Sequence, residues 1–433
     1  MVTDRESLAS RAVSAGLYKL GGHGASLAMR LGGNLVMTRL LAPEAFGLMA
    51  IVTALQVAMV MFSDFGMRTA IVRSRNGEHP DFLRTVFTLQ VGQFAIIAFL
   101  ILAVAGGLAV AQDYADFGET VYGDPRLPIL LALSSLAMVA QGLRSTNIAV
   151  ADRKLLQARV TVMELVSQFA GVASTIGVGF VYPTVYALIV GMIVSSSVSA
   201  IMTHAIFPGP RMGFALRRDF VAEIWGFGRW LVGASIMGFF ANQGDRLVLS
   251  ALMTKEQLGL YAIAMLWVGA ARIAIRKVMS PTMAALSELW RDRRHDLPRG
   301  FAKVRRVQDA ISFAAGLGLV FGGEHLMRLL YDDVFAASGE FVTLLAFMLV
   351  LTRYQPFGAL LLTAGDSKRV ALVTFVASVA MLATTPFAFN HLGLFWATLF
   401  IGLNRVWVAP ILIAGAGRHI PVNWPRELLE LSA

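Results

Sequence analysis

The sequence predicts an all-α polytopic membrane protein with about twelve transmembrane helices in two six-helix lobes. Of its 433 residues, 57% are hydrophobic and 15% are charged, and the mean hydropathy is +0.67. Soluble domains are less apolar and more charged, so a soluble globular protein is excluded. Apolar stretches of spanning length and an internal repeat are the second and third observations. The chain has no cysteine, which excludes disulfides and thiolate metal sites.

Each predicted helix is an apolar stretch close to the roughly 20 residues that cross a bilayer. The stretches cover residues 14–38, 45–67, 86–110, 127–143, 160–181, 185–206, 224–249, 258–280, 310–330, 341–362, 370–389 and 392–415. Helices are expected because backbone polar groups in lipid must bond within their own segment.

The basic residues predict the orientation of these helices. With the N-terminus inside, the inner connections hold most of the Lys and Arg, whereas two outer loops are acidic, with Asp113, Asp116, Glu119 and Asp124 in one and Asp332, Asp333 and Glu340 in the other. This bias predicts cytoplasmic termini. It also explains the net charge of +10 without a nucleic-acid partner. The polar N-terminus lacks the pattern of a cleaved signal peptide, so the first apolar segment is expected to remain as a span.

An internal repeat relates the two halves. Shifting LVMTRLLAPEAFGLMAI, residues 35–51, by 212 positions places it on LVLSALMTKEQLGLYAI, residues 247–263, with eight identities and no gap. Because six helices is an even number, both halves enter the membrane in the same sense. The helix-breaking Pro208, Gly209 and Pro210 mark the boundary. The predicted lobes are therefore residues 1–210 and 211–433.

Polar residues within the spans are the candidate binding residues. Ionisable groups there cost about 2.5–3.5 kcal/mol each on insertion scales, so they usually face a wet cavity. Lys19, His23, Ser26, Arg30 and Asn34 share one face of the first helix and predict a cationic stripe. The alternative for Lys19 and His23 is that they extend to the inner interface.

Further polar residues lie in the second half. The candidates are Arg229 and Asn242 on the seventh helix, Arg353 on the tenth and Arg405 on the twelfth. Guanidinium groups bind phosphate oxygens bidentately and stay charged, so a cavity lined by them suits a phosphate-bearing anion better than an organic cation.

Three acids are candidates for ion coupling: Asp64, Glu164 and Asp245. Each has a structural alternative. Asp64 has the spacing to pair with Arg68 on a helix. Glu164 shares its face with Gln168, Gly171 and Thr175, which packing explains nearly as well. Asp245 and Arg246 could form a salt bridge at the outer interface.

The motifs of common enzymes are missing from the sequence. It contains no GxxxxGK[ST] phosphate loop, no HExxH and no GxSxG. We therefore expect no catalytic residue and no metal site. The longest outer loop, residues 111–126, is too short for a glycan polymerase or ligase.

Three segments carry a family resemblance. They are TRLLAPEAFGLMAIVTAL, FSDFGMRTAIVR and NQGDRLVLSALMTKEQLGLYAIAMLW, which begin at residues 38, 62 and 242. Together they resemble the oligosaccharide flippase, or polysaccharide exporter, family of the multidrug/oligosaccharidyl-lipid/polysaccharide exporter superfamily. Related peptidoglycan-precursor flippases typically carry two further helices, which this chain lacks.

The resemblance implies transfer of a polyprenyl-diphosphate-linked oligosaccharide, for O-antigen, capsule or exopolysaccharide, across a bacterial inner membrane by alternating access. Cavity cations would hold the diphosphate, with Arg30, Arg353 and Arg405 in that role. Expected partners are the lipid-linked substrate, membrane lipid and polysaccharide polymerase or export machinery. No cofactor is expected, and H⁺ or Na⁺ coupling or consumption of the product would drive transfer. The alternatives are an ion-coupled antiporter of drugs or organic cations from the same superfamily and a non-transporting scaffold.

Glycan specificity would depend on aromatic and amide side chains. The candidates are Gln90, Gln93, Trp267, Trp396 and Asn404, which roles in the core or at the interface explain equally well.

Overall fold

The computed structural model describes the backbone of residues 8–420 and, apart from residues 8–17, 19, 20, 227, 229 and 230, their side chains. The regular elements in this range are all helices, and one isolated antiparallel bridge joins Thr120 to Thr254. The α-helices are α1(Leu8–Met37), α2(Pro43–Phe62), α3(Met67–Arg73), α4(Pro80–Tyr114), α5(Arg126–Gly142), α6(Asn147–Arg153), α7(Gln157–Val181), α8(Tyr186–Ile206), α9(Arg218–Ser250), α10(Lys255–Val278), α11(Thr282–Asp292), α12(Leu297–Leu330), α13(Asp333–Ala336), α14(Ser338–Val350), α15(Gln355–Thr363), α16(Ser367–Leu392), α17(Leu394–Gly402) and α18(Ala409–Ala416). Short 3₁₀ helices are η1(Val121–Gly123), η2(Arg294–Asp296), η3(Leu351–Tyr354) and η4(Asn404–Val408).

The number of spanning helices agrees with the predicted fold class. Among the described residues, eight helices are long and apolar enough to cross a membrane, or up to eleven when each sharply bent pair counts as one span. The bent pairs include α5 with α6, at 58°, and α17 with the η4–α18 segment, at 45°. The 30-residue α1 covers the remaining predicted span. The prediction of an all-α polytopic membrane protein is confirmed.

The helix order repeats with the spacing found in the sequence. Pro43, which begins α2, and Lys255, which begins α10, are 212 residues apart, as are Arg126 of α5 and Ser338 of α14. Helices α1, α4 and α7 likewise correspond to α9, α12 and α16. The segment that joins α8 to α9, where Pro208 and Pro210 lie, is not helical. The duplication inferred from residues 35–51 therefore extends over each half.

The chain divides into two compact units. Unit 1 is Met1–Ile236 with Thr254–Gly259, and unit 2 is Met237–Met253 with Leu260–Ala433. This division falls inside α9 and at the start of α10, because both helices contribute residues to each unit. The predicted lobes, 1–210 and 211–433, follow the repeat instead and stay a prediction.

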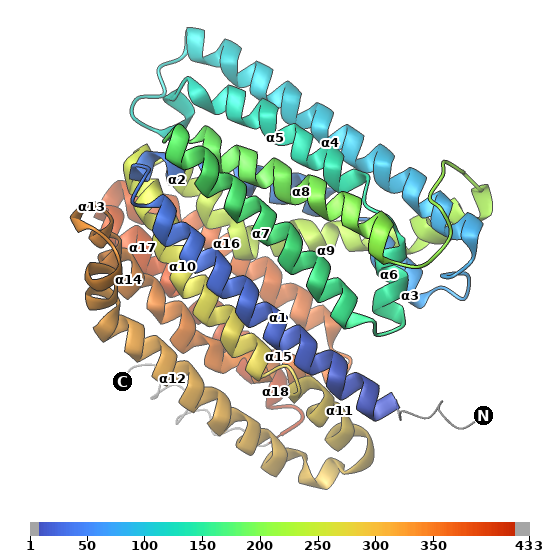
Figure 1. Ribbon diagram of the computed structural model, residues 1–433. Coiled ribbons are helices and arrows are strands. Elements are labelled where there is room, and N and C mark those ends of the chain that lie inside the picture. The colour runs from blue at the N-terminus through green and yellow to red at the C-terminus, as the bar shows by residue number, and fades with distance from the viewer. Residues whose placement is uncertain (1–7, 421–433) are drawn as a thin grey trace. The chain divides into compact units, whose positions relative to one another are not determined.

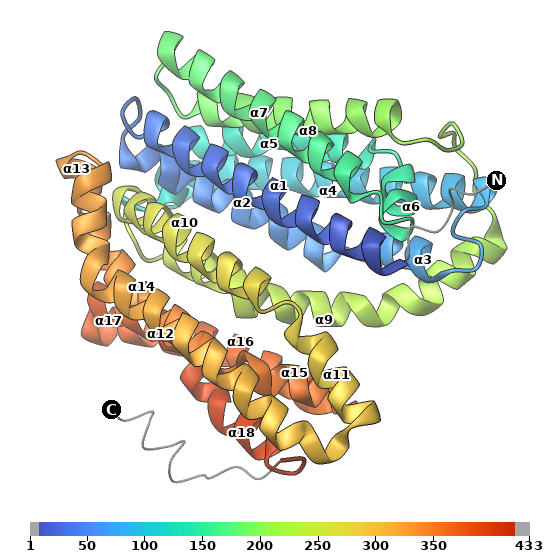
Figure 2. The same cartoon turned by 60° about the horizontal axis from the view of Figure 1, so that its bottom comes forward.

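Unit 1 contains α1 to α8, which run beside one another in Figures 1 and 2. Helix α1 packs on α7, where Gly22 faces Thr161 and Gly33 faces Val172. Ser26 bonds to Gln168 of α7 through its hydroxyl and through its carbonyl oxygen, which accepts from Gln168 Nε2 at 2.6 Å. The glycine positions of α1 thus allow two helices to approach closely.

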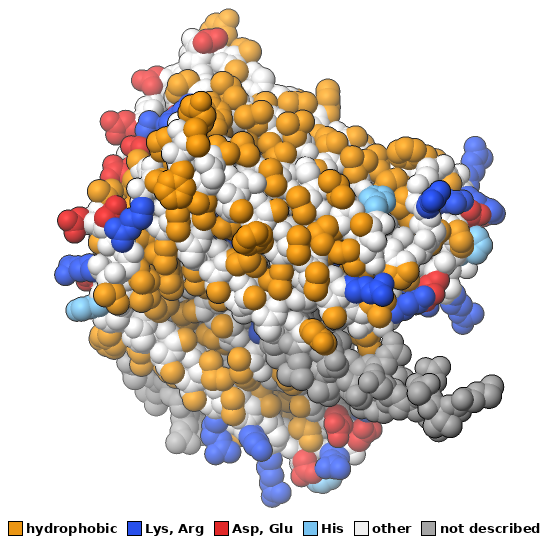
Figure 3. Space-filling model, viewed as in Figure 1, with side chains coloured by type: hydrophobic (Ala, Val, Ile, Leu, Met, Phe, Trp, Pro, Cys, Tyr) orange, Lys and Arg blue, Asp and Glu red, His pale blue; other side chains and the backbone are white. Residues whose placement is uncertain are grey.

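The outer face of unit 1 is apolar. In Figure 3, hydrophobic side chains cover the visible face over α4, α5, α7 and α8, and charged side chains gather where these helices end. Ile96 and Phe99 of α4 and Phe169 of α7 are each more than 60% exposed. Exposed side chains of this kind are expected on helices that face lipid.

A reciprocal contact joins the N-terminal ends of α2 and α10. A Cβ atom on Gly47 would collide with the carbonyl oxygen of Lys255, and a Cβ atom on Gly259 would collide with that of Pro43. Both pairs of residues are repeat equivalents, since each is related by 212 positions. Glycine is required at both positions because the partner atom is backbone and has little freedom to move.

The loop between α4 and α5 fixes the same end of α10. Lys255 N donates to the carbonyl oxygen of Glu119 at 3.2 Å, and Lys255 Nζ lies 3.3 Å from Asp124 Oδ2. Asp124, whose side chain is 2% exposed, also accepts from Arg126 Nη2 at 2.7 Å. Burial raises the pKa of Asp124, but the hydrogen bonds from Arg126 and Lys255 outweigh it and lower the pKa from 3.8 to about 2.

The reciprocal contact predicts that Gly259→Ala destabilises the protein by about 1–3 kcal/mol, because the added methyl group has no space. Thermal unfolding of the purified protein in detergent measures the change. Gly92→Ala on α4 is the control, since a Cβ there meets nothing within 4 Å. An unchanged unfolding temperature for Gly259→Ala would contradict the close approach.

The lowered pKa of Asp124 predicts a stability that depends on pH. This carboxylate stabilises the fold above its unfolded pKa of 3.8, and the contribution is lost as the pH falls through about 2. We expect the unfolding temperature of Asp124→Asn to fall less than that of the native protein between pH 4 and pH 2. Asp113→Asn, exposed in the last turn of α4, should behave like the native protein, and an identical profile for Asp124→Asn would refute the assignment.

Candidate functional site

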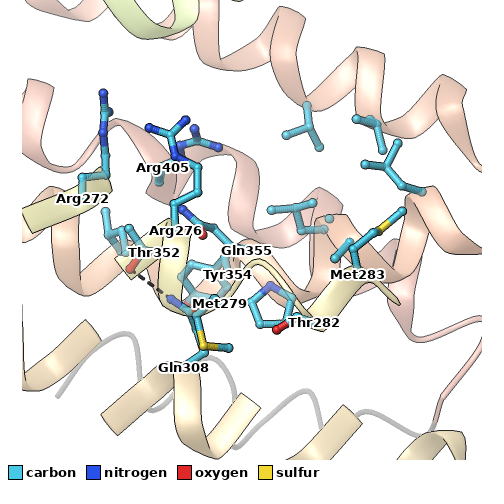
Figure 4. Close-up of a pocket in the computed structure, with 18 of the residues that line it drawn as sticks. Arg272, Arg276, Met279, Thr282, Met283, Gln308, Thr352, Tyr354, Gln355 and Arg405 are labelled. Carbon is cyan, nitrogen blue, oxygen red and sulfur yellow. Dashed lines mark hydrogen bonds between the residues drawn. The ribbon is translucent and has the colours of Figure 1, made fainter. Parts of the chain in front are cut away.

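A cavity of unit 2 lies beside α10, α12, α15 and α16 and encloses about 540 Å³ (Figure 4). The turn between α10 and α11, the 3₁₀ helices η3 and η4, and α18 complete its wall. The 3₁₀ segment η3 joins α14 to α15, and its residues Thr352 and Tyr354 line the wall. This volume falls within the roughly 300–1,000 Å³ of small-molecule sites.

Three arginines line this cavity. Arg272 and Arg276 are one helical turn apart on α10, and Arg405 comes from η4. Figure 4 shows the three side chains on the same side of the cavity. Arg405 is within electrostatic range of both others. Over the described part of the chain, no carboxylate forms an ion pair with any of the three, although Asp245 lies within electrostatic range of Arg272. This wall therefore carries an excess of positive charge.

Uncharged polar groups lie on the wall formed by α12 and η3. Gln308 Nε2 donates to Ser312 Oγ at 2.9 Å and to Thr352 Oγ1 at 3.3 Å, and the two hydroxyl groups are 2.7 Å apart. Gln308 Oε1 is buried and accepts no hydrogen bond from any residue that the structure describes. Gln308 therefore retains an acceptor for a ligand or a water molecule.

The cavity is apolar away from the arginines. Met279 and Met283 follow the C-terminal end of α10, and Figure 4 places Met283 far from Arg272. Leu362, Val370 and Val373 belong to the same lining. Methionine side chains are flexible and polarisable, so they fit apolar groups of varied shape. The cavity can thus hold a ligand with an anionic end and an apolar end.

Arg353, predicted for the cavity, lies behind it. Its side chain is 5% exposed, and its Nε lies 3.3 Å from Asp309 Oδ1 on α12. Its guanidinium carbon lies 5.2 Å from the ring centroid of Phe313 and 5.7 Å from that of Tyr354. Arg305 Nε also approaches Asp309, at 3.5 Å. Because this charge is paired and stacked, Arg353 has a structural role here, and its role in binding stays a prediction.

Asp245 is buried in unit 2 and bonds to a tyrosine. Its Oδ2 accepts from the hydroxyl of Tyr261 on α10, while its Oδ1 has no hydrogen-bond partner among the described residues. No ion pair joins Asp245 to Arg246 in this part of the chain, so the alternative of a salt bridge at the outer interface is not observed. Asp245 therefore keeps one oxygen that no described residue uses, and its coupling role stays a prediction.

The predicted stripe of α1 belongs to unit 1. His23 and Asn34 are half-buried and Arg30 is exposed, and all three take part in interactions. The side chains of Lys19 and Arg229 lie outside the described residues. Asn242, in unit 2, is exposed and donates to the carbonyl oxygen of Gly238 on its own helix at 2.8 Å.

The expected pairing of Asp64 with Arg68 is wrong. Helix α2 ends at Phe62, so the two residues do not share a helix. Asp64 Oδ1 instead accepts from Gly66 N at 2.8 Å, and Arg68 pairs with Asp152 of α6. The i, i+4 rule did not apply because the chain turns between α2 and α3.

Most of the residues that share a face of α7 with Glu164 contact the neighbouring helices α1 and α8. Gln168 bonds to α1, and Gly171 and Thr175 pack against Gly191 of α8. Glu164 itself is exposed, within electrostatic range of Arg144. Its coupling role is untested.

The amide and aromatic candidates for glycan recognition have other contacts. Gln93 Nε2 donates to Ser63 O at 2.7 Å, and Trp267 Nε1 donates to the Tyr331 hydroxyl at 2.9 Å. Asn404 Nδ2 donates to Ala377 O at 3.3 Å. These three side chains are therefore used within the protein, as their structural alternative predicts.

The predicted site residues did not include Arg272 and Arg276, which were counted among the basic residues of the inner connections. Two arginines four residues apart within an apolar helix were the available signal, because this spacing places both on one helix face. Arg405 was predicted, and it lines the cavity with them.

Comparison with known proteins identifies the family. Residues 36–340 match the family described as polysaccharide biosynthesis protein. The chain belongs to this family. It is 23% identical over 336 residues to the lipopolysaccharide biosynthesis protein WzxC of Escherichia coli (strain K12), covering 76% of this chain and 65% of WzxC. It is 24% identical over 265 residues to the succinoglycan biosynthesis transport protein ExoT of Rhizobium meliloti (strain 1021), covering 61% of this chain and 50% of ExoT. The chain thus spans between half and two thirds of the length of these relatives.

Solved structures share the fold. The lipid II flippase MurJ in an inward closed conformation superposes with a TM-score of 0.70 at 12% identity, over 94% of this chain and 88% of MurJ. An inward-facing multidrug resistance MATE family transporter of the MOP superfamily superposes with a TM-score of 0.64 at 15% identity, over 90% of this chain and 94% of the transporter. The fold expected for the exporter superfamily is confirmed. Sequence identities this low show a shared fold and do not show a shared function.

The buried ion pair of unit 2 predicts that Asp309→Asn destabilises the protein by about 3–5 kcal/mol, because it leaves the Arg353 charge without its carboxylate. A double variant, Asp309→Leu with Arg353→Met, should recover part of the loss, because Arg305 still lacks the carboxylate that it approaches. Arg328→Gln, which breaks the exposed pair with Glu324, is the control and should cost less than about 1 kcal/mol. Thermal unfolding in detergent measures all three, and a stable Asp309→Asn protein would contradict the structural role of Arg353.

Proposed function

We propose that this protein transfers a polyprenyl-diphosphate-linked oligosaccharide, an O-antigen, capsule or exopolysaccharide repeat unit, from the cytoplasmic to the outer leaflet of a bacterial inner membrane. The activity is transport and involves no covalent step. The family supports a role in polysaccharide biosynthesis. The name of ExoT as a transport protein and that of MurJ as a lipid II flippase support movement of a lipid-linked precursor.

The observation that carries this proposal is the set of three unpaired arginines in the cavity of unit 2. Arg272, Arg276 and Arg405 each provide guanidinium donors, and none of the three forms an ion pair with an acidic residue that the structure describes. Guanidinium groups pair bidentately with phosphate oxygens, so this wall fits a diphosphate. An isolated cation would be repelled from the same wall.

The remainder of the cavity supports a ligand that is not anionic throughout. Gln308 and Thr352 offer hydrogen bonds to hydroxyl groups, and Met279 and Met283 offer apolar contact. A cavity of about 540 Å³ has room for the diphosphate and the groups attached directly to it. The polyprenyl tail would remain in the bilayer while the headgroup crosses.

The driving force belongs to the proposal as well. Alternating access needs either an ion gradient or removal of product on the far side. Asp245 is our first candidate for coupling to H⁺ or Na⁺, because it is buried and keeps one oxygen available. Asp64 and Glu164 rank behind it, since Asp64 accepts a backbone hydrogen bond and Glu164 is exposed. A polymerase or export machinery would take the product at the outer face.

A second candidate function is ion-coupled antiport of drugs or organic cations. The buried Asp245 favours it, as does the fold shared with a multidrug resistance transporter. The three cavity arginines oppose it, because they would repel a cationic substrate. Efflux of an organic cation that depends on Asp245 but not on Arg276 would support antiport.

The cavity predicts that Arg276→Gln lowers transfer of the lipid-linked oligosaccharide. Loss of one charge-assisted phosphate contact is worth about 1.5–3 kcal/mol, or about ten- to a hundredfold in apparent affinity. The measurement is transfer of a fluorescent polyprenyl-diphosphate oligosaccharide between leaflets of liposomes that contain the purified protein. Arg276→Lys should retain part of the activity, because it keeps the charge but not the bidentate geometry.

Arg291→Gln is the control, since Arg291 is exposed on α11 and pairs only locally with Asp292. Normal transfer by both Arg276→Gln and Arg405→Gln would exclude the cavity as the diphosphate site. Arg30→Ala tests the predicted stripe of α1 in the same assay and should also lower transfer without unfolding the protein.

A further inference from the structure

A second, smaller cavity lies in unit 1, and none of the residues that line it belongs to the proposed substrate site. It encloses about 130 Å³ between α3, α4 and the bend that separates α5 from α6. Figures 1 and 2 both show α3 and α6 side by side at this end of the unit. Its polar lining consists of Arg68, Gln90, Gln141, Arg144, Ser145 and Thr146.

Arg144 is the unusual member of this lining. Its Nε is buried and donates to no residue that the structure describes, although the side chain sits beside the positive charge of Arg68. Arg68 is already paired with Asp152. Glu164 is within electrostatic range of Arg144 but forms no ion pair with it among the described residues. The cavity therefore keeps a guanidinium group without an anion, and burying such a group is costly unless an anion binds.

Other side chains form hydrogen bonds with the backbone around Arg144. The guanidinium donors of Arg144 are therefore not used to satisfy this backbone. Gln90 Nε2 donates to the carbonyl oxygens of Gly142, at 2.9 Å, and Arg144, at 2.8 Å. Ser145 N donates to Thr203 Oγ1 at 2.9 Å. These bonds hold the bend between α5 and α6 in place and leave the Arg144 guanidinium facing the cavity.

The position of this cavity repeats that of the site in unit 2. Adding 212 to Arg68, Ile71, Arg144 and Thr146 gives Ser280, Met283, Pro356 and Gly358, and all eight residues line their respective cavities. Unit 1 thus forms its cavity at the bend between α5 and α6, and unit 2 forms its cavity at the equivalent segment, η3 and the start of α15. The chemistry differs, because the arginines of unit 2 come from α10 and η4, whereas unit 1 uses α3 and the bend itself.

The surroundings point to the membrane surface. Leu136, Val139 and Leu143 form an exposed apolar strip on α5 that ends beside Arg144. Figure 3 shows Lys and Arg side chains gathered at the same end of unit 1, beyond the hydrophobic band. Basic pockets between helices at this depth bind the head groups of anionic lipids.

We infer that the unit 1 cavity binds a phosphate group through Arg144 and Arg68, supplied either by an anionic phospholipid headgroup or by a soluble phosphate compound. The volume of about 130 Å³ admits a phosphate group but not a sugar chain. The phosphate oxygens would accept the donors of Arg144 that no residue uses. This inference does not rest on the proposed transport, because the cavity lies in the other unit and its test measures binding alone.

The test uses the purified full chain in detergent and follows binding by native mass spectrometry and by thermal unfolding. The probes are phosphatidylglycerol, diacylglycerol, which lacks the phosphate, and inorganic phosphate against chloride at equal ionic strength. We expect phosphatidylglycerol, or inorganic phosphate if the source is soluble, to bind and raise the unfolding temperature. Arg144→Gln should weaken that binding about tenfold, as expected for the loss of one charge-assisted contact.

Arg75→Gln is the matched control, because it removes the same charge from an exposed residue between α3 and α4. Arg144→Lys should bind better than Arg144→Gln, which separates loss of the charge from damage to the fold. Equal binding by Arg144→Gln and the native protein would overturn the inference, as would stabilisation by diacylglycerol equal to that by phosphatidylglycerol without any effect of inorganic phosphate.

Discussion

A guanidinium group inside a membrane protein needs either a carboxylate or a polar cavity, because its hydration is lost in the hydrocarbon region. Unit 2 uses both solutions, the first on η3 and the second on α10 and η4. Arg353 is paired with Asp309 and stacked on Phe313, so its charge supports the packing of η3 against α12. Arg272, Arg276 and Arg405 have no acidic partner and face a cavity instead. The paired arginine thus stabilises the fold, whereas the arginines without an ion pair are available to a ligand.

The same rule accounts for the chemistry of the two repeats. Each forms a cavity where the regular α-helix is interrupted, by the bend between α5 and α6 in unit 1 and by the 3₁₀ segment η3 in unit 2. Backbone polar groups at such interruptions need polar side chains as partners. In unit 1 Gln90 does this for the bend beside Arg144, and in unit 2 Thr352 and Gln308 lie at the corresponding break. Duplication thus preserved the place of the cavity, while its arginines come from different positions in each half. One cavity suits a diphosphate with attached groups, and the other suits a single phosphate.

The close backbone contact at Gly47 and Gly259 joins equivalent helices of the two repeats, α2 and α10. The carbonyl oxygens of Lys255 and Pro43 occupy the space where side chains would otherwise lie, so neither glycine tolerates a larger residue without a shift. These glycines are among the eight identities between residues 35–51 and 247–263. The strongest part of the sequence repeat therefore coincides with the closest contact between the equivalent helices.

The sequence by itself determined the fold class, most of the helices and the duplication, because hydropathy and a 212-residue repeat are local properties of the chain. It also selected Arg405, whose isolation in an apolar segment requires a polar environment. Only the tertiary structure decided which charges are compensated. Asp309 is 44 residues from Arg353 and Asp152 is 84 residues from Arg68, so neither pair follows from helical spacing. Which arginines keep their donors for a ligand depends on such distant partners, and those are fixed only when the helices pack.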